Sequence, residues 1–269
     1  MSADGAEEAL LTAARGGDRE ALTALLHRHQ AQIYRFSRAM CRDVADAEDV
    51  LQDTMLALAR GVTGIRGPSV STWLYAVARS ACARRRRRSR HAPSALLPLD
   101  EARDQAEDPR PGPEESLDAA RLDAALHEAI HGLAPMYREV LALRDVEGLS
   151  AAEVAATLNL SEAAVKSRLH RARVQVRDRL APLLGPAPAP RAPGCPDVAT
   201  LLSKKLEGQV SARTCAELEA HLASCAPCRG ACDTLREALA LCRSSASPEV
   251  PEQVQRAVAR AVQNFLSAA

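Results

Sequence analysis

The stretch EGLSAAEVAATLNLSEAAVKSRLHRAR, residues Glu147 to Arg173, decides the fold, because it predicts two helices joined by a tight turn. Ser150 is placed to cap the first helix, and Glu153 follows three residues later as its capping-box partner. Asn159 can adopt the left-handed conformation that ends this helix. Ser161 is then placed to cap the second helix.

The second helix has an apolar face and a basic face. Its buried face is predicted by the helical spacing of Val165, Leu169, Ala172 and Val176. A basic outward row on the second helix of such a pair is typical of a recognition helix in the major groove of DNA. A basic, solvated surface helix is the alternative, which the caps, turn and arginine bias together disfavour. The side chains expected at DNA are Ser161, Glu162, Lys166, Ser167, His170, Arg171 and Arg173.

These motifs resemble a known family. Residues 147–173 are similar to region 4 of the extracytoplasmic-function sigma factors, which reads the −35 promoter element. Independently, the residues Gly17-Asp18, Ala21, Leu25, Ile33 to Phe36 and Asp46 to Thr54 resemble regions 2.1 and 2.2 of the same family. The resemblance covers roughly residues 6 to 180. It implies an all-α transcription initiation factor that binds core RNA polymerase, through the β′ clamp and the β flap, and promoter DNA.

An acidic row opens the helix expected from Asp43 to Arg60. By itself, such a row is explained by the favourable interaction of carboxylates with a helix N-terminus. In the family that the chain resembles, this helix docks on the coiled coil of the β′ clamp. The resemblance assigns that role here to Asp46, Asp49, Gln52 and Asp53.

A loop and a capped helix, GVTGIRGPSVSTW at residues 61–73, resemble the −10 reader, in which a loop captures a flipped base. Aromatic faces and loops can offset the cost of unstacking a base, although a lone tryptophan is more often a core residue. The arginine run at residues 84–88 is expected to be solvated or bound to a polyanion. The residues expected at the −10 DNA are Thr63, Arg66, Ser69, Ser71, Trp73, Arg79, Arg84 and Arg85.

Six of the eight cysteines fall between Cys195 and Cys242. His221, Cys225 and Cys228 form an H-x3-C-x2-C pattern, and with Cys195 they make four ligands that suit Zn(II), while thiolate-rich sets also suit Cu(I) or Cd(II). Cys215, Cys232 and Cys242 are further candidate ligands. Cys41 and Cys82 look isolated and are expected to be small packing residues.

The cysteine pattern also resembles a family domain, the zinc-containing anti-sigma fold. Fusion of such a domain to a sigma factor resembles the CorE-type factors, which respond to metal without a separate anti-sigma protein. A purely structural zinc site is the alternative. The sequence leaves open the metal, its oxidation state and the direction of any response.

The length and composition of the chain are consistent with several small domains joined by linkers. The chain has 269 residues and a formal net charge of only +1, so DNA affinity must come from local basic patches. We expect sigma region 2 at 6–90, an acidic, proline-rich linker at 91–115, sigma region 4 at 116–181, a proline-rich linker at 182–194 and a cysteine-rich domain at 195–269. No apolar run approaches the roughly 20 residues of a membrane span, which favours a cytoplasmic protein.

Two other functions compete with the sigma factor. A stand-alone helix-turn-helix metalloregulator would usually dimerise on a palindromic site, and the chain has no evident dimer seam. A thiol enzyme using the CAPC sequence would need a βαβ pattern, which is absent from the sequence. We therefore do not expect an enzyme.

Overall fold

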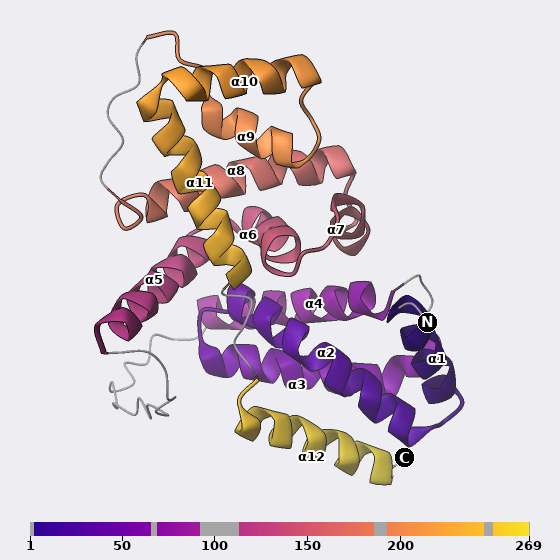
Figure 1. Ribbon diagram of the computed structural model, residues 1–269. Helices are drawn as coiled ribbons and strands as arrows, with labels where there is room; N and C mark the ends of the chain where they lie inside the picture. Colours follow the sequence, from indigo (N-terminus) through magenta and orange to yellow (C-terminus); the bar gives the residue numbers. More distant parts are fainter. Residues whose placement is uncertain (1–2, 66–68, 92–112, 186–192, 245–249, 269) are drawn as a thin grey trace.

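The computed structural model describes residues 3–65, 69–91, 113–185, 193–244 and 250–268. Within these ranges every regular element is a helix, which confirms the predicted all-α fold (Figure 1). None of the described helices combines the length and the apolar character that a membrane span requires.

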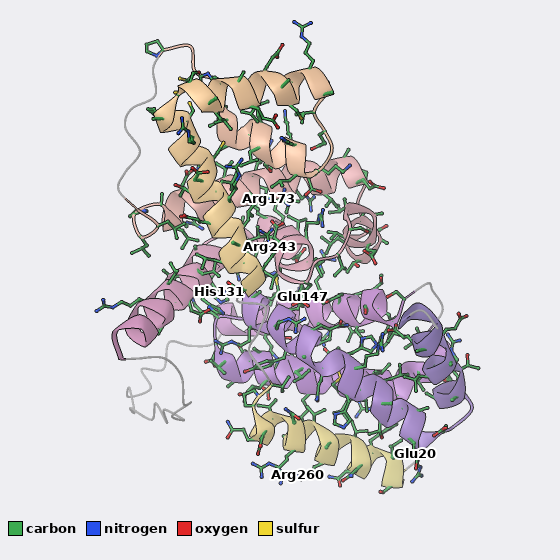
Figure 2. The ribbon with its side chains drawn as sticks, in the orientation of Figure 1. Glu20, His131, Glu147, Arg173, Arg243 and Arg260 are labelled. Carbon is green, nitrogen blue, oxygen red and sulfur yellow. The ribbon has the colours of Figure 1, made fainter. Side chains whose placement is uncertain are left out.

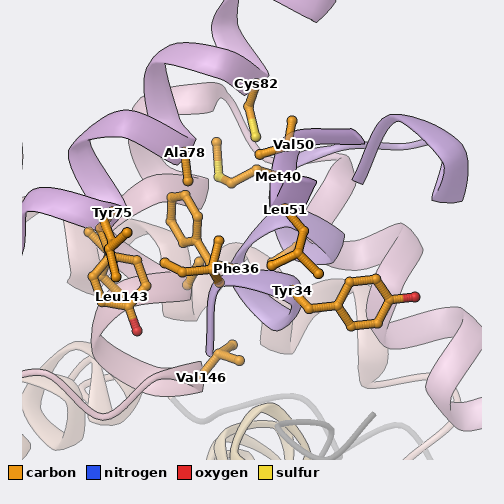
Figure 3. Close-up of a cluster of buried hydrophobic side chains, with 14 of the residues drawn as sticks. Tyr34, Phe36, Met40, Val50, Leu51, Tyr75, Ala78, Cys82, Leu143 and Val146 are labelled. Atoms are coloured by element: carbon orange, nitrogen blue, oxygen red, sulfur yellow. The ribbon is translucent and has the colours of Figure 1, made fainter. Parts of the chain in front are cut away.

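The N-terminal group consists of α1 (Ala3–Arg15), α2 (Arg19–Met40), α3 (Val44–Gly61), the short η1 (Val62–Gly64) and α4 (Val70–His91). Asp18 caps α2 by accepting hydrogen bonds from the backbone N–H groups of Glu20 and Ala21, as aspartate commonly does at a helix N-terminus. Phe36 and Tyr75 meet edge to face at 5.3 Å in the core that these helices share (Figure 3).

The middle group consists of α5 (Pro113–His131), α6 (Pro135–Leu141), η2 (Ala142–Val146), α7 (Ala151–Leu158) and α8 (Glu162–Leu180). Ser150 and Glu153 form both hydrogen bonds of a capping box, and Asn159 ends α7 with a φ of 54°. The predicted helix-turn-helix is therefore present with its predicted caps. After α6 the chain widens into a π-helical turn at η2.

The two groups pack against each other and share one continuous hydrophobic core. Glu147, after η2, lies between them (Figure 2), where it accepts hydrogen bonds from Arg35 Nη2 at 2.9 Å and from Tyr75 Oη at 3.1 Å. Arg79 on α4 forms a second bridge to Glu139 on α6, at 3.0 Å. Burial raises the pKa of Glu147, while the Arg35 guanidinium favours its charged form.

The remaining helices are α9 (Val198–Leu206), α10 (Ala212–Ser224), α11 (Ala226–Ser244) and α12 (Glu252–Ala268). The first three surround a small core of their own, and α9 and α11 lie on α8, whereas α12 lies beside α3 at the other end of the molecule (Figure 1). Val254, Val258 and Val262 form the buried face of α12. The region predicted at 195–269 is thus divided between the middle group and the N-terminal group.

Candidate functional site

The structure brings together Cys195, His221, Cys225 and Cys228, whose nearest possible ligand atoms all lie within 4.8 Å of one another. Cys195 Sγ and Cys225 Sγ are 3.9 Å apart. Two sulfurs of a tetrahedral zinc site, each about 2.3 Å from the ion, lie about 3.8 Å apart. His221 Nε2 is buried and has no hydrogen-bond partner among the described residues, so this donor set fits a metal ion.

Helix ends place the four ligands. Cys225 is the C-cap of α10, and its N–H donates to His221 O at 2.9 Å. Cys228 follows in the first turn of α11, where its backbone N–H lowers the pKa of Cys225. Cys195 comes from the segment before α9, which Asp197 caps. A bound ion would therefore join three separate segments.

The other candidate cysteines do not join this group in the structure. Cys232 is buried in the core of α9, α10 and α11, and Cys242 is buried in the main core. Cys215 is half-buried on α10 and lies outside the four-residue group. Among the described residues, the group of possible metal ligands therefore consists of four residues. These are Cys195 and the three residues of the H-x3-C-x2-C pattern.

Helix α8 carries the predicted −35 contacts, and only part of its outward row faces solvent. Ser161, Glu162, Ser167 and Arg171 are exposed, and Lys166 is half-buried. His170 is also half-buried, and its Nε2 lies 3.2 Å from Thr200 Oγ1 on α9. The helices α9 and α11 both contact α8 (Figure 1). The C-terminal segment that carries the four clustered residues therefore sits directly on the predicted recognition helix.

Arg173 corrects the sequence prediction, because its side chain is only 3% exposed and does not point outward. Its Nη2 donates to Asp145 Oδ1 at 2.6 Å and to Glu207 Oε1 at 2.8 Å. Arg144 adds a second contact to Glu207, at 3.3 Å. Figure 2 shows Arg173 where α8 meets the C-terminal helices. Two carboxylates compensate for burying this guanidinium.

Sequence spacing gave no signal for this cluster. Asp145 lies in η2 and Glu207 follows α9, so the three charged residues come from separate parts of the chain. The packing of η2 against α8 brings Asp145 to Arg173, and the packing of the C-terminal segment on α8 adds Glu207.

The predicted −10 residues occupy varied positions. Thr63 is exposed, and Ser69 is half-buried. Ser71 Oγ accepts a hydrogen bond from Gln32 at 3.0 Å. Trp73 is half-buried and packs against the main core, near Gly61. Arg66 lies outside the described residues.

Arg85 is a second correction, because it binds the protein's own acidic row. It lies 2.8 Å from Asp49, 3.2 Å from Asp53 and 3.5 Å from Asp46. The three carboxylates remain about half exposed, and Gln52 is half-buried beside them. The acidic row is therefore accessible to a partner. Arg85 is engaged with this row, whereas Arg84 is exposed to solvent.

Three ranges of the chain match known protein families, one in each of the two predicted sigma regions and one in the cysteine-rich segment. Residues 25–92 match the family described as Sigma-70 region 2, and residues 123–176 match Sigma-70, region 4. Residues 195–229 match the family described as Putative zinc-finger, and this range contains all four clustered ligands.

Individual relatives agree with these matches. The chain is 37% identical to ECF RNA polymerase sigma factor SigM of Mycobacterium tuberculosis over 177 residues, which cover 65% of this chain and 83% of SigM. It is 34% identical to SigE of Mycolicibacterium smegmatis, over 61% of this chain and 65% of SigE. It is also 28% identical to the RNA polymerase sigma-H factor of Pseudomonas aeruginosa, over 66% and 95% of the two chains. The chain therefore belongs to the extracytoplasmic-function RNA polymerase sigma factors, alternative sigma factors for promoter-specific transcription initiation, and carries a zinc-finger segment behind its sigma regions.

Proposed function

We propose that this sigma factor is held in an inactive, closed arrangement by its own C-terminal segment, and that metal bound by that segment stabilises the closed state. The observation that carries the proposal is the burial of Arg173 between α8 and the residues around Glu207. A recognition helix covered by another part of the chain cannot enter a major groove until that part moves away.

The contacts on α8 support this step. Lys166, His170 and Arg173 lie four and three residues apart, so they share one stripe of the helix. His170 contacts Thr200, and Arg173 contacts Glu207, both in the C-terminal segment. The segment therefore covers the C-terminal part of this stripe, at His170 and Arg173.

The packing of the two sigma regions supports the same proposal. Positions −10 and −35 are about 25 base pairs apart, which is about 85 Å of DNA at a rise of 3.4 Å per base pair. In the structure, Glu147 of the middle group is bonded to Arg35 and Tyr75 of the N-terminal group. Reading both elements at once requires this interface to open. Helix α12 adds to the closed state, since it lies on α3 while α9 and α11 lie on α8.

We propose zinc as the metal, because three cysteines and one histidine form a closed tetrahedral donor set. Cys195, His221, Cys225 and Cys228 would hold the ion, which would supply the cross-link between the start of α9 and the α10–α11 corner. The core of these helices is small, so folding of the segment and metal affinity are linked. Loss of metal would then release α8.

The Cys225→Ser variant is expected to lose stoichiometric zinc and to make residues 193–244 susceptible to limited proteolysis, because the ligand that joins α10 to α11 is removed. Promoter binding by the variant with core polymerase should rise at the same time. Zinc content by atomic absorption and cleavage patterns by mass spectrometry test this.

Cys215→Ser is the matched control, since Cys215 lies on α10 but outside the ligand group. It should keep its zinc and its protease resistance. Equal zinc content in both variants would contradict the assignment of Cys225, and zinc loss without a rise in promoter binding would contradict the regulatory role.

We also propose that the acidic row of α3 binds the β′ clamp of core polymerase, and that region 4 binds the β flap and the −35 DNA. The exposure of Asp46, Asp49 and Asp53 supports the first contact. This proposal places the chain in the cytoplasm, where transcription occurs.

The double substitution Asp49→Lys and Asp53→Lys is expected to weaken binding to purified core polymerase by at least about tenfold, because like charges then face each other across a desolvated contact. Biolayer interferometry with immobilised core polymerase measures this. Glu217→Lys is the control, since Glu217 is an exposed acid of α10, outside both sigma regions. Unchanged binding by the double variant would place the clamp contact elsewhere.

A further inference from the structure

Two cysteines far from the metal ligands lie beside each other in the N-terminal group. Cys41 follows the last residue of α2, and Cys82 lies within α4. Their Sγ atoms are 3.3 Å apart. Both are buried in the core, as expected of small packing residues, but the expectation that they are isolated is wrong, because the fold makes them a pair. Figure 3 shows Cys82 in the same buried cluster as Met40 and Val50.

The geometry is close to that of a disulfide. A disulfide has an S–S distance of about 2.05 Å, so the two sulfurs need to approach by about 1.3 Å. Cys41 has an extended backbone, with φ −99° and ψ 135°, and so stands outside the regular part of α2. Its side chain can adjust without bending a helix. Cys41 is 8% exposed and Cys82 is 3% exposed, which makes Cys41 the sulfur nearer to solvent.

The surroundings give the two sulfurs different roles. The hydrogen bond with Cys82 lowers the pKa of Cys41, and the guanidinium groups of Arg85 and Arg138 act in the same direction, against burial and Asp46. The same hydrogen bond and burial raise the pKa of Cys82. Because the thiolate is the reactive form of cysteine, Cys41 is suited to react first and Cys82 to react second.

We propose that Cys41 and Cys82 form a reversible disulfide when the chain meets a hydroperoxide. The Cys41 thiolate attacks the O–O bond of hydrogen peroxide, which gives a sulfenic acid and releases hydroxide, protonated to water. Cys82 sulfur then attacks the sulfenic sulfur, loses its proton and displaces a second hydroxide, which also leaves as water. Two thiols and one peroxide become one disulfide and two waters, and a dithiol reductant reverses the change.

The position of the pair gives the disulfide a structural consequence. Cys41 lies two residues before Asp43, the N-cap of α3, and Cys82 lies three residues before Arg85. Arg85 is bonded to the acidic row of α3. A disulfide would therefore link the start of α3 to the part of α4 that holds this row.

The test treats the full-length, zinc-loaded chain with hydrogen peroxide, blocks remaining thiols with iodoacetamide and maps cross-linked peptides by mass spectrometry. The expected product joins the peptide of Cys41 to that of Cys82, and dithiothreitol removes it. The oxidised chain should melt roughly 5 °C or more above the reduced chain. Zinc content should be unchanged when the cross-link first appears, which separates this pair from the metal ligands.

Cys41→Ser should lack both the cross-link and the melting shift, whereas the control Cys215→Ser should retain both. If Cys41→Ser does not fold, the peptide map of the wild-type chain decides alone. Oxidation that joins Cys41 or Cys82 to other cysteines, or leaves both open to iodoacetamide, would overturn the proposal.

Discussion

Removal of the chain after Leu184 is expected to tighten promoter binding, in complex with core RNA polymerase, by about 100-fold. This factor corresponds to a closed state that leaves about 1% of the intact protein open. The deletion removes α9 and α11 from α8 and α12 from α3, so the free energy that holds the closed state no longer opposes binding. Fluorescence anisotropy with a labelled promoter, selected from a randomised library by the truncated holoenzyme, measures the change.

Two controls show whether the gain acts through the recognition helix. In the truncated chain, Lys166→Ala and Arg171→Ala should each weaken promoter binding by about 1 to 3 kcal/mol if the residue contacts a base. Size-exclusion chromatography must show a monomer, because the deletion also uncovers the apolar surface under Val254, Val258 and Val262. Equal affinities of the full-length and truncated chains would rule out inhibition by the C-terminal segment.

Glu207→Ala is expected to open the intact chain and to raise promoter affinity roughly tenfold. Glu207 accepts bonds from Arg173 and Arg144, and its side chain is 3% exposed. Without the Glu207 carboxylate, Arg173 keeps only Asp145 as its acidic partner in the closed state. The free energy of the closed state should then rise by about 1 to 3 kcal/mol. In the open state, water solvates Arg173 in both proteins. The substitution therefore destabilises the closed state selectively, and the same anisotropy titration measures the effect.

The matched control for this substitution is Glu219→Ala. Glu219 is an exposed acid of α10 that pairs with Lys205 and does not reach α8. Promoter affinity and zinc content should stay at the wild-type values. If Glu207→Ala behaves like this control, the buried ion cluster does not set the balance between the closed and open states.

Local features were predictable from the sequence because they depend on neighbouring residues. The capping box of Ser150 and Glu153 and the left-handed Asn159 were confirmed in place. The metal ligands His221, Cys225 and Cys228 lie within two turns of chain, so their spacing alone predicted that they meet.

Contacts between distant segments were not predictable in this way. Arg173 has the helical spacing of an exposed residue next to Lys166 and His170, yet it is buried between Asp145 of η2 and Glu207 of the C-terminal segment. Arg85 and its acidic partners come from separate helices, as do Cys41 and Cys82. Periodicity shows which side of one helix is polar, but it does not show which other element covers that side.

The C-terminal segment is attached at two ends: α9 and α11 lie on α8, and α12 lies on α3. This attachment would fix the ratio of inhibitor to sigma factor in the cell. A separate inhibitor must be synthesised in proportion to its target, and its occupancy falls when both are diluted. In the proposed closed state, every copy of the protein carries its own inhibitor, at an effective concentration in the millimolar range. The threshold of the proposed response is then independent of expression level and depends on the metal supply alone.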